Sequence, residues 1–244
     1  MARRELYDEL PSTQDRAIEL ARGGAEDGSV VVARRQSHGR GRGDRRWESP
    51  AGGLYVSIVL RPGAPATVLP LAIGAELARG LAETYGVRLR LKWPNDLLAV
   101  DPGGAPRKVA GILVDVVPGG DRPAAVVGIG VNARSTGPGL SGPVGAGSVA
   151  LEELTASEVA FDALETLVLH AARDACRALS FDRGSEAVLA RVRGLLYGVG
   201  EPVMVDGAPV GTLVGLRGDG ALEVTGPRGV EALFAGDVRV GAGR

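Results

Sequence analysis

The chain has 244 residues, of which 45% are hydrophobic and 23% are charged, and its formal net charge is −1. These values describe a globular protein with a buried hydrophobic core, and they exclude a disordered tail or a surface devoted wholly to nucleic acid. No apolar run approaches the roughly 20 residues that cross a bilayer, and no signal peptide begins the chain, so we expect a cytoplasmic protein outside any membrane. One cysteine, Cys176, and two histidines exclude an internal disulfide and a transition-metal cluster.

The first predicted elements are a helix and two strands. The string Ser12-Thr13-Gln14-Asp15 is typical of a helix start, and the apolar stripe after it predicts a helix over about residues 13–22. Apolar or alternating runs predict strands at residues 29–33 and 54–61. Glycines and a proline interrupt residues 35–53 between them, so we expect a long loop there, and such a loop in a compact domain is usually functional or disordered.

The middle of the chain predicts one long helix and four strands. Helical spacing over residues 68–85 ends at Gly86. Strands are expected at residues 87–91, 97–100, 108–117 and 124–131, with the last two forming a hairpin. Residues 133–148 have the composition of a surface loop, and two further helices are expected at about 157–179 and 184–195.

The pattern changes after Gly198 to short strands separated by turn signals. The strands are expected at residues 202–205, 210–216, 221–224 and 230–234. We therefore predict two domains, residues 1–195 and a small β-barrel in residues 196–244.

Lysine is rare in this chain. Of 28 lysines and arginines, only Lys92 and Lys108 are lysines, and each begins a string with the composition of a ligand site. Arginine is a broad planar fork whereas lysine is a compact point charge, so these exceptions indicate a small anionic oxygen as the partner. The alternative is two surface lysines retained by chance.

Residues 34–47, with the sequence RRQSHGRGRGDRRW, form a strongly basic loop that carries six arginines and one aspartate. Glycines let the backbone approach a ligand, and arginines and backbone N–H groups bind anions. The loop is neither a Walker A motif nor a dinucleotide-binding motif. An RNA-binding segment remains an alternative. Trp47 at its end is either a core anchor, the better interpretation taken singly, or a stacking platform for a flat base.

Two further strings contain polar residues beside predicted strands. In Lys92-Trp93-Pro94-Asn95-Asp96 the proline favours an extended or turning backbone. An Asn-Asp pair in a turn is commonly turn chemistry, although Asp96 could also orient an amine, accept its proton or hold Mg²⁺. Gly128-Ile129-Gly130-Val131-Asn132 indicates either close strand packing before a turn or part of the same site.

Seven strings, taken in order, resemble the biotin protein ligases, also called biotin–acetyl-CoA-carboxylase ligases. They are Ser12-Thr13-Gln14, Gln36-Ser37-His38-Gly39-Arg40-Gly41-Arg42, Trp47-Glu48-Ser49-Pro50, Gly52-Gly53-Leu54, Lys92-Trp93-Pro94-Asn95-Asp96, Lys108-Val109-Ala110-Gly111-Ile112-Leu113 and Gly130-Val131-Asn132. The resemblance covers about residues 8–132.

The resemblance implies an α+β fold, with a mixed sheet flanked by helices in the catalytic domain and an SH3-like β-barrel after it. It also implies a two-step reaction. The carboxylate of biotin attacks the α-phosphate of MgATP to give biotinyl-5′-AMP and pyrophosphate. A lysine amine of a biotin carboxyl carrier protein then attacks the acyl carbon and releases AMP. Cations would offset the repulsion between carboxylate and phosphate.

The resemblance also assigns residues to these steps. The biotin site would comprise Ser12, Thr13, Gln14, Gln36, Gly39, Arg40, Gly41, Arg42, Lys108 and Gly111. The nucleotide site would comprise Arg42, Arg45, Trp47, Asn95 and Asn132, with Trp47 stacked on adenine. The catalytic groups would be Lys108 at the biotin carboxyl oxygen, Arg42 at the adenylate phosphate, and Lys92 and Asp96 beside the phosphates and the incoming amine. The ligands of Mg²⁺ are left unassigned.

The sequence departs from the family pattern at three places. Gly43-Asp44 replaces a basic residue and glycine, residues 100–106 look like an insertion, and only about 10 residues precede Ser12. From the last point we expect no DNA-binding domain and no DNA partner. A homodimer is also suggested by the resemblance. The alternatives are a lipoate or octanoyl ligase, whose Arg-Arg-x-Ser-Gly-Gly-Gly string is absent, and a non-catalytic biotin or biotinyl-AMP sensor.

Overall fold

The computed structural model describes residues 1–63, 67–102, 104–119, 122–135 and 147–241. Its larger sheet has seven strands in the order β1-β2-β3-β7-β6-β5-β4. The strands are, in that order, β1 (Arg4–Tyr7), β2 (Val30–Ala33), β3 (Gly53–Leu60), β7 (Ala124–Asn132), β6 (Arg107–Val117), β5 (Asp96–Ala99) and β4 (Arg90–Lys92). Only β1 and β2 pair in parallel, and every other pair is antiparallel. The predicted mixed sheet is therefore confirmed.

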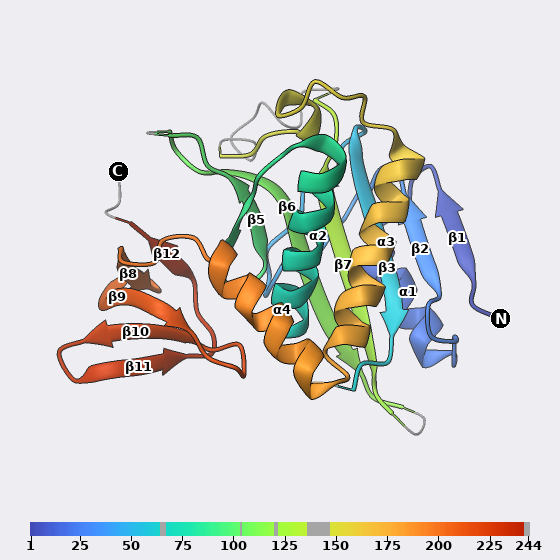
Figure 1. Ribbon diagram of the computed structural model, residues 1–244. Helices are drawn as coiled ribbons and strands as arrows, with labels where there is room; N and C mark the ends of the chain where they lie inside the picture. The colour runs from blue at the N-terminus through green and yellow to red at the C-terminus, as the bar shows by residue number, and fades with distance from the viewer. Residues whose placement is uncertain (64–66, 103, 120–121, 136–146, 242–244) are drawn as a thin grey trace.

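Helices cover both faces of this sheet, as Figure 1 shows, with α2 (Leu69–Tyr85) and α3 (Phe161–Ala178) in front and α1 (Thr13–Arg22) behind. A fourth helix, α4 (Asp182–Leu195), packs beside α2. All residues of β3 are buried because its alternate side chains meet different helices. Val56 and Ile58 join the core beneath α2 and α3, whereas Tyr55 and Val59 join the core beneath α1.

The helix boundaries follow from local sequence. The hydroxyl of Ser12 accepts a hydrogen bond from the backbone N–H of Asp15 at 3.2 Å and caps the first turn of α1. The C-terminal end of α2 is set by Gly86, which adopts a φ of 70°, in the left-handed region that favours glycine. The predicted helices at residues 13–22 and 68–85 are confirmed. None of the described helices is both long and apolar enough to cross a bilayer.

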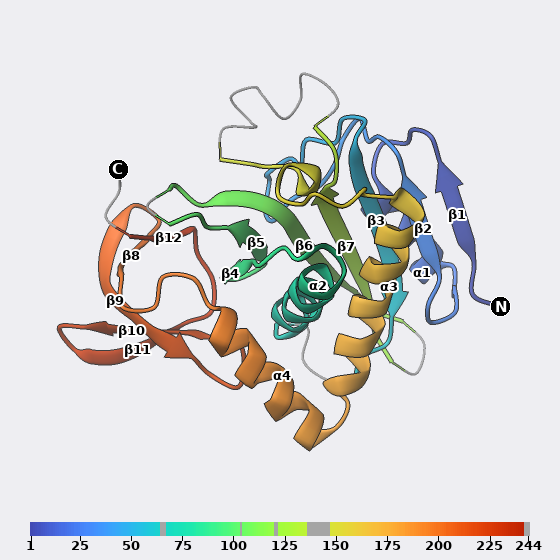
Figure 2. The same cartoon turned by 45° about the horizontal axis from the view of Figure 1, so that its top comes forward.

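The C-terminal residues form a separate antiparallel sheet of five strands in the order β11-β10-β9-β8-β12. The strands are β8 (Pro202–Val205), β9 (Ala208–Leu216), β10 (Leu222–Gly226), β11 (Gly229–Leu233) and β12 (Val238–Val240). This sheet confirms the expected small SH3-like domain, but β11 and β12 do not pair with each other in the described residues, so the sheet is open rather than a closed barrel. Figures 1 and 2 place it beside α4 and β5, on the side of the molecule away from β1.

Several sequence predictions differ in detail from the structure. The strand expected at residues 87–91 begins only at Arg90, and the strands β1 and β12 were not predicted. Most of the loop expected at residues 133–148, and part of the turn between β6 and β7, lie outside the described residues. The connection to the small sheet was also unforeseen. The indole N–H of Trp93 donates to the carbonyl of Gly220 at 2.9 Å, which makes this tryptophan a buried anchor between the two sheets.

Candidate active site

A pocket lies on the face of the larger sheet that α1 covers, beyond the N-terminus of that helix. Its floor is made by glycines on two neighbouring strands, because Gly111 of β6 pairs with Gly130 of β7 and Gly128 follows on the same face. A Cβ atom at Gly130 or Gly111 would lie 2.6 Å or 2.7 Å from the ring of Trp47. The absence of side chains at these positions therefore creates the space above the sheet.

A β-bulge turns Lys108 into this pocket. The register between β5 and β6 shifts, so that Leu97 pairs with Ala110 but Leu98 pairs with Lys108, and Val109 is left without a partner. Since side chains alternate along a strand, the extra residue places Lys108 on the same face as Gly111. Its Nζ lies 2.7 Å from Oδ1 of Asp96 and 4.6 Å from the centroid of the Trp47 ring.

Asp96 reaches Lys108 because the turn between β4 and β5 is fixed to β6. The side-chain amide of Asn95 donates to the carbonyl of Ile112 at 2.8 Å, and the backbone N–H of Ile112 donates to the carbonyl of Asn95 at 2.9 Å. The carboxylate of Asp96 forms an ion pair with Lys108 but lacks a well-directed hydrogen bond at Oδ1. The Asn-Asp pair is thus both turn chemistry and part of the pocket wall.

The basic loop supplies the cations of the opposite wall. Within it the N–H of Gly41 donates to the carbonyl of Arg45 at 2.8 Å, which closes a tight turn around Arg42. Burial, followed by the charge of Arg45, lowers the pKa of Arg42, whereas Asp96 and Asp237 oppose that shift. Arg45 also pairs with Asp237 of the small sheet at 3.1 Å. A pocket that holds partly desolvated cations favours an anionic ligand.

Trp47 lies in the middle of the pocket. Its indole rests over Gly111 and Gly130 and beneath the ammonium group of Lys108. The indole N–H is buried and has no acceptor among the described residues. The ring therefore occupies space between the two ends of the pocket without completing its own hydrogen bonding.

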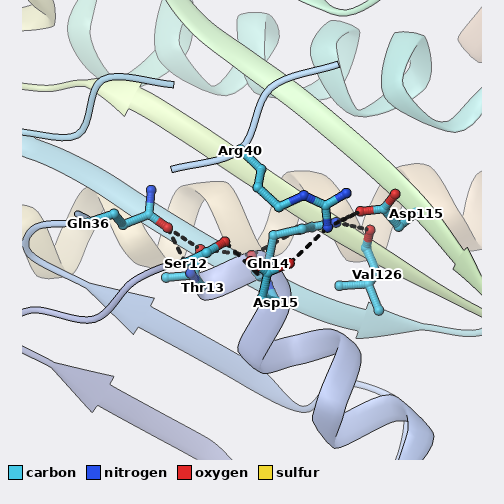
Figure 3. Close-up of polar contacts among 9 residues, drawn as sticks. Ser12, Thr13, Gln14, Asp15, Gln36, Arg40, Asp115 and Val126 are labelled. Carbon is cyan, nitrogen blue, oxygen red and sulfur yellow. Dashed lines mark hydrogen bonds and ion pairs between the residues drawn. The ribbon is translucent and has the colours of Figure 1, made fainter. Parts of the chain in front are cut away.

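The other end of the pocket is a hydrogen-bond network around the start of α1 that consists mainly of uncharged groups, and Figure 3 shows part of it together with the ion pairs of Arg40. The backbone N–H and the hydroxyl of Thr13 both donate to Oε1 of Gln36, at 2.7 and 3.0 Å. The amide nitrogen of Gln14 donates to the carbonyl of Val126 at 2.9 Å. The hydroxyl of Ser57 lies 2.9 Å from Oγ1 of Thr13 and 3.0 Å from Oε1 of Gln14. Ser57 is fully buried, so this network is removed from solvent.

Most of the residues that the sequence predicted for the site line this pocket together. They are Thr13, Gln14, Gln36, Arg40, Gly41, Arg42, Arg45, Trp47, Asn95, Asp96, Lys108 and Gly111. Four others, Ser12, Gly39, Lys92 and Asn132, are not among the lining residues. Ser12 caps α1, and Asn132 donates from its amide to the carbonyl of Lys108 at 3.0 Å. The ligand contacts assigned to all sixteen of these residues stay predictions.

Sequence reasoning missed several residues that line the pocket or support the residues that do. Ser57 is the one serine in the otherwise hydrophobic strand β3, and Asp115 is a carboxylate within an apolar run of β6. Both exceptions to the pattern were visible in the sequence and could have been used as signals. Tyr55, whose hydroxyl donates to the carbonyl of Pro50 at 2.8 Å, has no such signal because tyrosine is common in strands.

The pocket offers few ligands for a metal ion. Among the described residues no group of three histidine, cysteine, aspartate or glutamate side chains comes together. Asp96 is the only carboxylate that lines the described part of the pocket. One carboxylate is nevertheless sufficient for Mg²⁺ that arrives on a phosphate ligand, because such an ion keeps waters and phosphate oxygens in most of its coordination positions.

Comparison with known proteins gave consistent matches. The model of the biotin/lipoate A/B protein ligase family matches residues 7–132. The bifunctional ligase/repressor BirA of Bacillus subtilis (strain 168) is 39% identical over 131 residues, which cover 52% of this chain and 39% of that protein. A biotin–[acetyl-CoA-carboxylase] ligase of Paracoccus denitrificans is 42% identical over 145 residues, which cover 54% of this chain and 58% of that protein. The chain therefore spans between about two fifths and three fifths of these curated relatives.

A solved structure matches the whole fold. The biotin protein ligase from Aquifex aeolicus in complex with biotin and ATP has a TM-score of 0.81 and 27% sequence identity, and the match covers 98% of this chain and 99% of that one. Both sheets of the present structure are thus included in the match.

Proposed function

Since the chain belongs to the biotin/lipoate A/B protein ligase family, we propose that it is a biotin protein ligase. It activates biotin with MgATP and transfers the biotinyl group to a lysine of a biotin carboxyl carrier protein in the cytoplasm. The observation that carries this proposal is a single pocket with a neutral hydrogen-bonding end and a cationic end. Such a pocket suits a ligand that joins a polar ring to a carboxylate, and the match to a structure with biotin and ATP supports that ligand.

In the first step two anions must approach each other. An oxygen of the biotin carboxylate bonds to the α-phosphorus of ATP as the bond to the β-phosphate oxygen breaks, and pyrophosphate leaves. Lys108 neutralises the carboxylate oxygen, and Arg42 neutralises the α-phosphate, because both cations line the charged end of the pocket. Lys108 exchanges its present partner, Asp96, for the ligand in this step.

Mg²⁺ would neutralise the phosphates of ATP, and Asp96 and Asn95, which line the pocket beside Lys108, carry side-chain oxygens that would help to hold it. The fit is to an ion delivered with its nucleotide, because the described residues contain no cluster that would hold one alone.

In the second step the carrier lysine attacks the acyl carbon of biotinyl-AMP. The amine must first lose a proton, and Asp96 lies at the charged end of the pocket as the available carboxylate. The new amide bond forms as the bond from acyl carbon to phosphate oxygen breaks, and AMP leaves. Arg42 and Arg45 retain the adenylate until the amine arrives.

The test is to incubate the purified chain with biotin, MgATP and a carrier domain, and to measure covalent biotin on the carrier by mass spectrometry. We expect a mass increase of one biotinyl group that requires ATP. Tight biotin binding without transfer would instead identify a sensor, and transfer of octanoate or lipoate in place of biotin would identify the other activity of the family. Either result would overturn the proposal.

A further inference from the structure

We infer that Asp115 is a positioning residue that fixes the hydrogen-bonding pattern of the neutral end of the pocket and so selects a ligand with N–H donors. Asp115 belongs to none of the strings that resemble the family, and it does not line the pocket itself. Its carboxylate instead joins two residues that do, Gln14 of α1 and Arg40 of the basic loop. The inference rests on the proposed function, since it names what that pocket selects.

The strongest link runs from Asp115 to Gln14. The amide nitrogen of Gln14 donates to Oδ2 of Asp115 at 3.0 Å and to the carbonyl of Val126 at 2.9 Å. Both of its N–H groups are therefore used, and two acceptors on the same side fix which end of the amide is nitrogen. Figure 3 shows Asp115 and Val126 together on that side of Gln14. Because Gln14 is only 3% exposed, an N–H group that lost its partner would have little access to water.

This orientation leaves the carbonyl oxygen of Gln14 as an acceptor. Oε1 of Gln14 lies 3.0 Å from the hydroxyl of Ser57, which lies equally close, at 2.9 Å, to Oγ1 of Thr13. A hydroxyl has one proton, so it can serve only one of these two oxygens at a time. Among Ser57, Thr13 and Gln14, one acceptor position therefore stays open when the Ser57 proton is given to the other oxygen, and a ligand N–H can fill it.

This open acceptor position discriminates between ligands. A ureido ring carries two N–H groups that can donate to these oxygens, whereas an acyl chain or a dithiolane ring carries none. A site built to pair with N–H groups rejects a ligand that lacks them, because its own buried polar atoms then stay unpaired. By holding the amide of Gln14 in one orientation, Asp115 ensures that the ligand meets the carbonyl oxygen of Gln14, an acceptor, and not its NH₂ group.

The second link runs to the basic loop. Nη1 of Arg40 lies 3.2 Å from Oδ2 of Asp115 and 3.0 Å from Oδ1 of Asp15. Arg40 therefore bridges β6 and α1, as Figure 3 shows, and its charge is already paired with carboxylates. These side chains are 30–54% exposed, so each ion pair contributes little, whereas the hydrogen bond to Asp115 from Gln14 begins at a buried amide. The loop is nevertheless tied to the same carboxylate that orients Gln14.

Three variants separate the two links. In Asp115→Asn the new side chain keeps an oxygen that accepts from Gln14 but loses the charge that faces Arg40. In Asp115→Leu both links are lost. Asp15→Asn is the matched control, because it removes the other carboxylate at Arg40 and leaves Gln14 untouched. Thermal unfolding of each variant checks that it is folded before kinetics are compared.

The measurement is the rate of pyrophosphate release from ATP, first with biotin as the acid substrate and then with octanoate in its place. For Asp115→Leu we expect the KM for biotin to rise about tenfold with kcat within about twofold, because a buried donor loses its partner. The preference for biotin over octanoate, as the ratio of kcat/KM values, should fall by a similar factor. For Asp115→Asn and Asp15→Asn we expect increases in KM of no more than about threefold.

Three results would overturn the inference. They are a wild-type KM and preference in Asp115→Leu, a loss confined to kcat, and equal effects of the leucine and asparagine variants. Calorimetric titration with biotin alone repeats the comparison of affinities without turnover. If the wild-type chain releases no pyrophosphate, the proposed activity fails, whereas the role of Asp115 is still decided by the relative affinities for biotin.

Discussion

The two ends of the pocket differ in how far their polar groups are already paired. At the neutral end Thr13, Gln14 and Gln36 are buried or half-buried and hydrogen-bonded to one another or to the sheet. At the charged end Arg42 has no paired carboxylate among the described residues, and the indole N–H of Trp47 has no acceptor there. The difference teaches that one end is organised before a ligand arrives, whereas the other gains its counter-charge from the ligand.

This contrast follows from the cost of burying each kind of group. A neutral polar atom in the interior is stabilised once it has a hydrogen-bond partner, so most of this network can persist without a ligand. Cations held close together repel each other, and an anion relieves that repulsion. Changes at the charged end should therefore affect the chemical steps, and changes at the neutral end should affect the binding of biotin.

The largest effect is expected from Lys108→Ala. Removing the ammonium group leaves the biotin carboxylate without its cation as it approaches the α-phosphate, so pyrophosphate release should fall by about 10²–10³-fold. Stopped assays with radiolabelled ATP measure this rate. Arg107→Ala is the matched control, since Arg107 precedes it on β6 but pairs with Asp101 at 2.7 Å outside the pocket. Pyrophosphate release at the wild-type rate by Lys108→Ala would show that Lys108 does not assist the formation of biotinyl-AMP.

The next effect concerns retention of the adenylate. Arg42→Gly removes a charge-assisted donor to the phosphate, so biotinyl-AMP should escape and label bystander proteins about tenfold or more above the wild-type level. Labelling of added serum albumin, followed by streptavidin blotting, reports the escape. The control is Arg35→Gly, in which an exposed arginine of the same loop is removed outside this pocket. Labelling confined to the carrier would show that the loop does not retain the intermediate through Arg42.

A smaller effect is expected from Gly128→Ala at the neutral end. The added Cβ would collide with Oε1 of Gln14, so the KM for biotin should rise by about tenfold while kcat changes little. Initial rates over a range of biotin concentrations separate the two constants. Gly194→Ala serves for comparison because its Cβ would meet no atom within 4 Å. If kcat fell and KM did not, the division of labour between the two ends would be wrong.

The smallest effect is expected from Asp237→Asn, which tests whether the small sheet assists the charged end. The pair between Asp237 and Arg45 is exposed, and such pairs contribute about 0–1 kcal/mol, so the KM for ATP should change by no more than about fivefold. Raising the salt concentration should reduce the difference from wild type because the charges are then screened. A change in the KM for biotin alone would contradict the placement of Arg45 at the charged end.

The sequence predicted those parts of the fold that depend on local periodicity. The apolar spacing before Gly86 and the capping pattern at Ser12 sufficed for α2 and α1. In contrast, β1 has four residues with the sequence RELY, and its half-exposed pattern lacks the apolar run of a buried strand. It becomes a strand because β2 provides a parallel partner.

For the site, too, short sequence motifs identified residues, whereas the contacts that position those residues depend on tertiary structure. Motif resemblance named Lys108 and Gln14, but the bulge at Val109 that turns Lys108 into the pocket depends on the pairing of β5 with β6. The contact from Gln14 to Asp115 joins residues 101 positions apart. Neither depends on a pattern within one segment, so single-sequence reasoning had no means of locating them.

The most direct test is a crystal structure of the chain with biotinyl-5′-AMP. We predict that the ureido ring lies against Thr13, Gln14 and Ser57, that the acyl phosphate lies between Lys108 and Arg42, and that the indole of Trp47 leaves its position over Gly111 and Gly130. A ligand bound in the reverse direction, or one bound outside this pocket with the indole unmoved, would contradict the account.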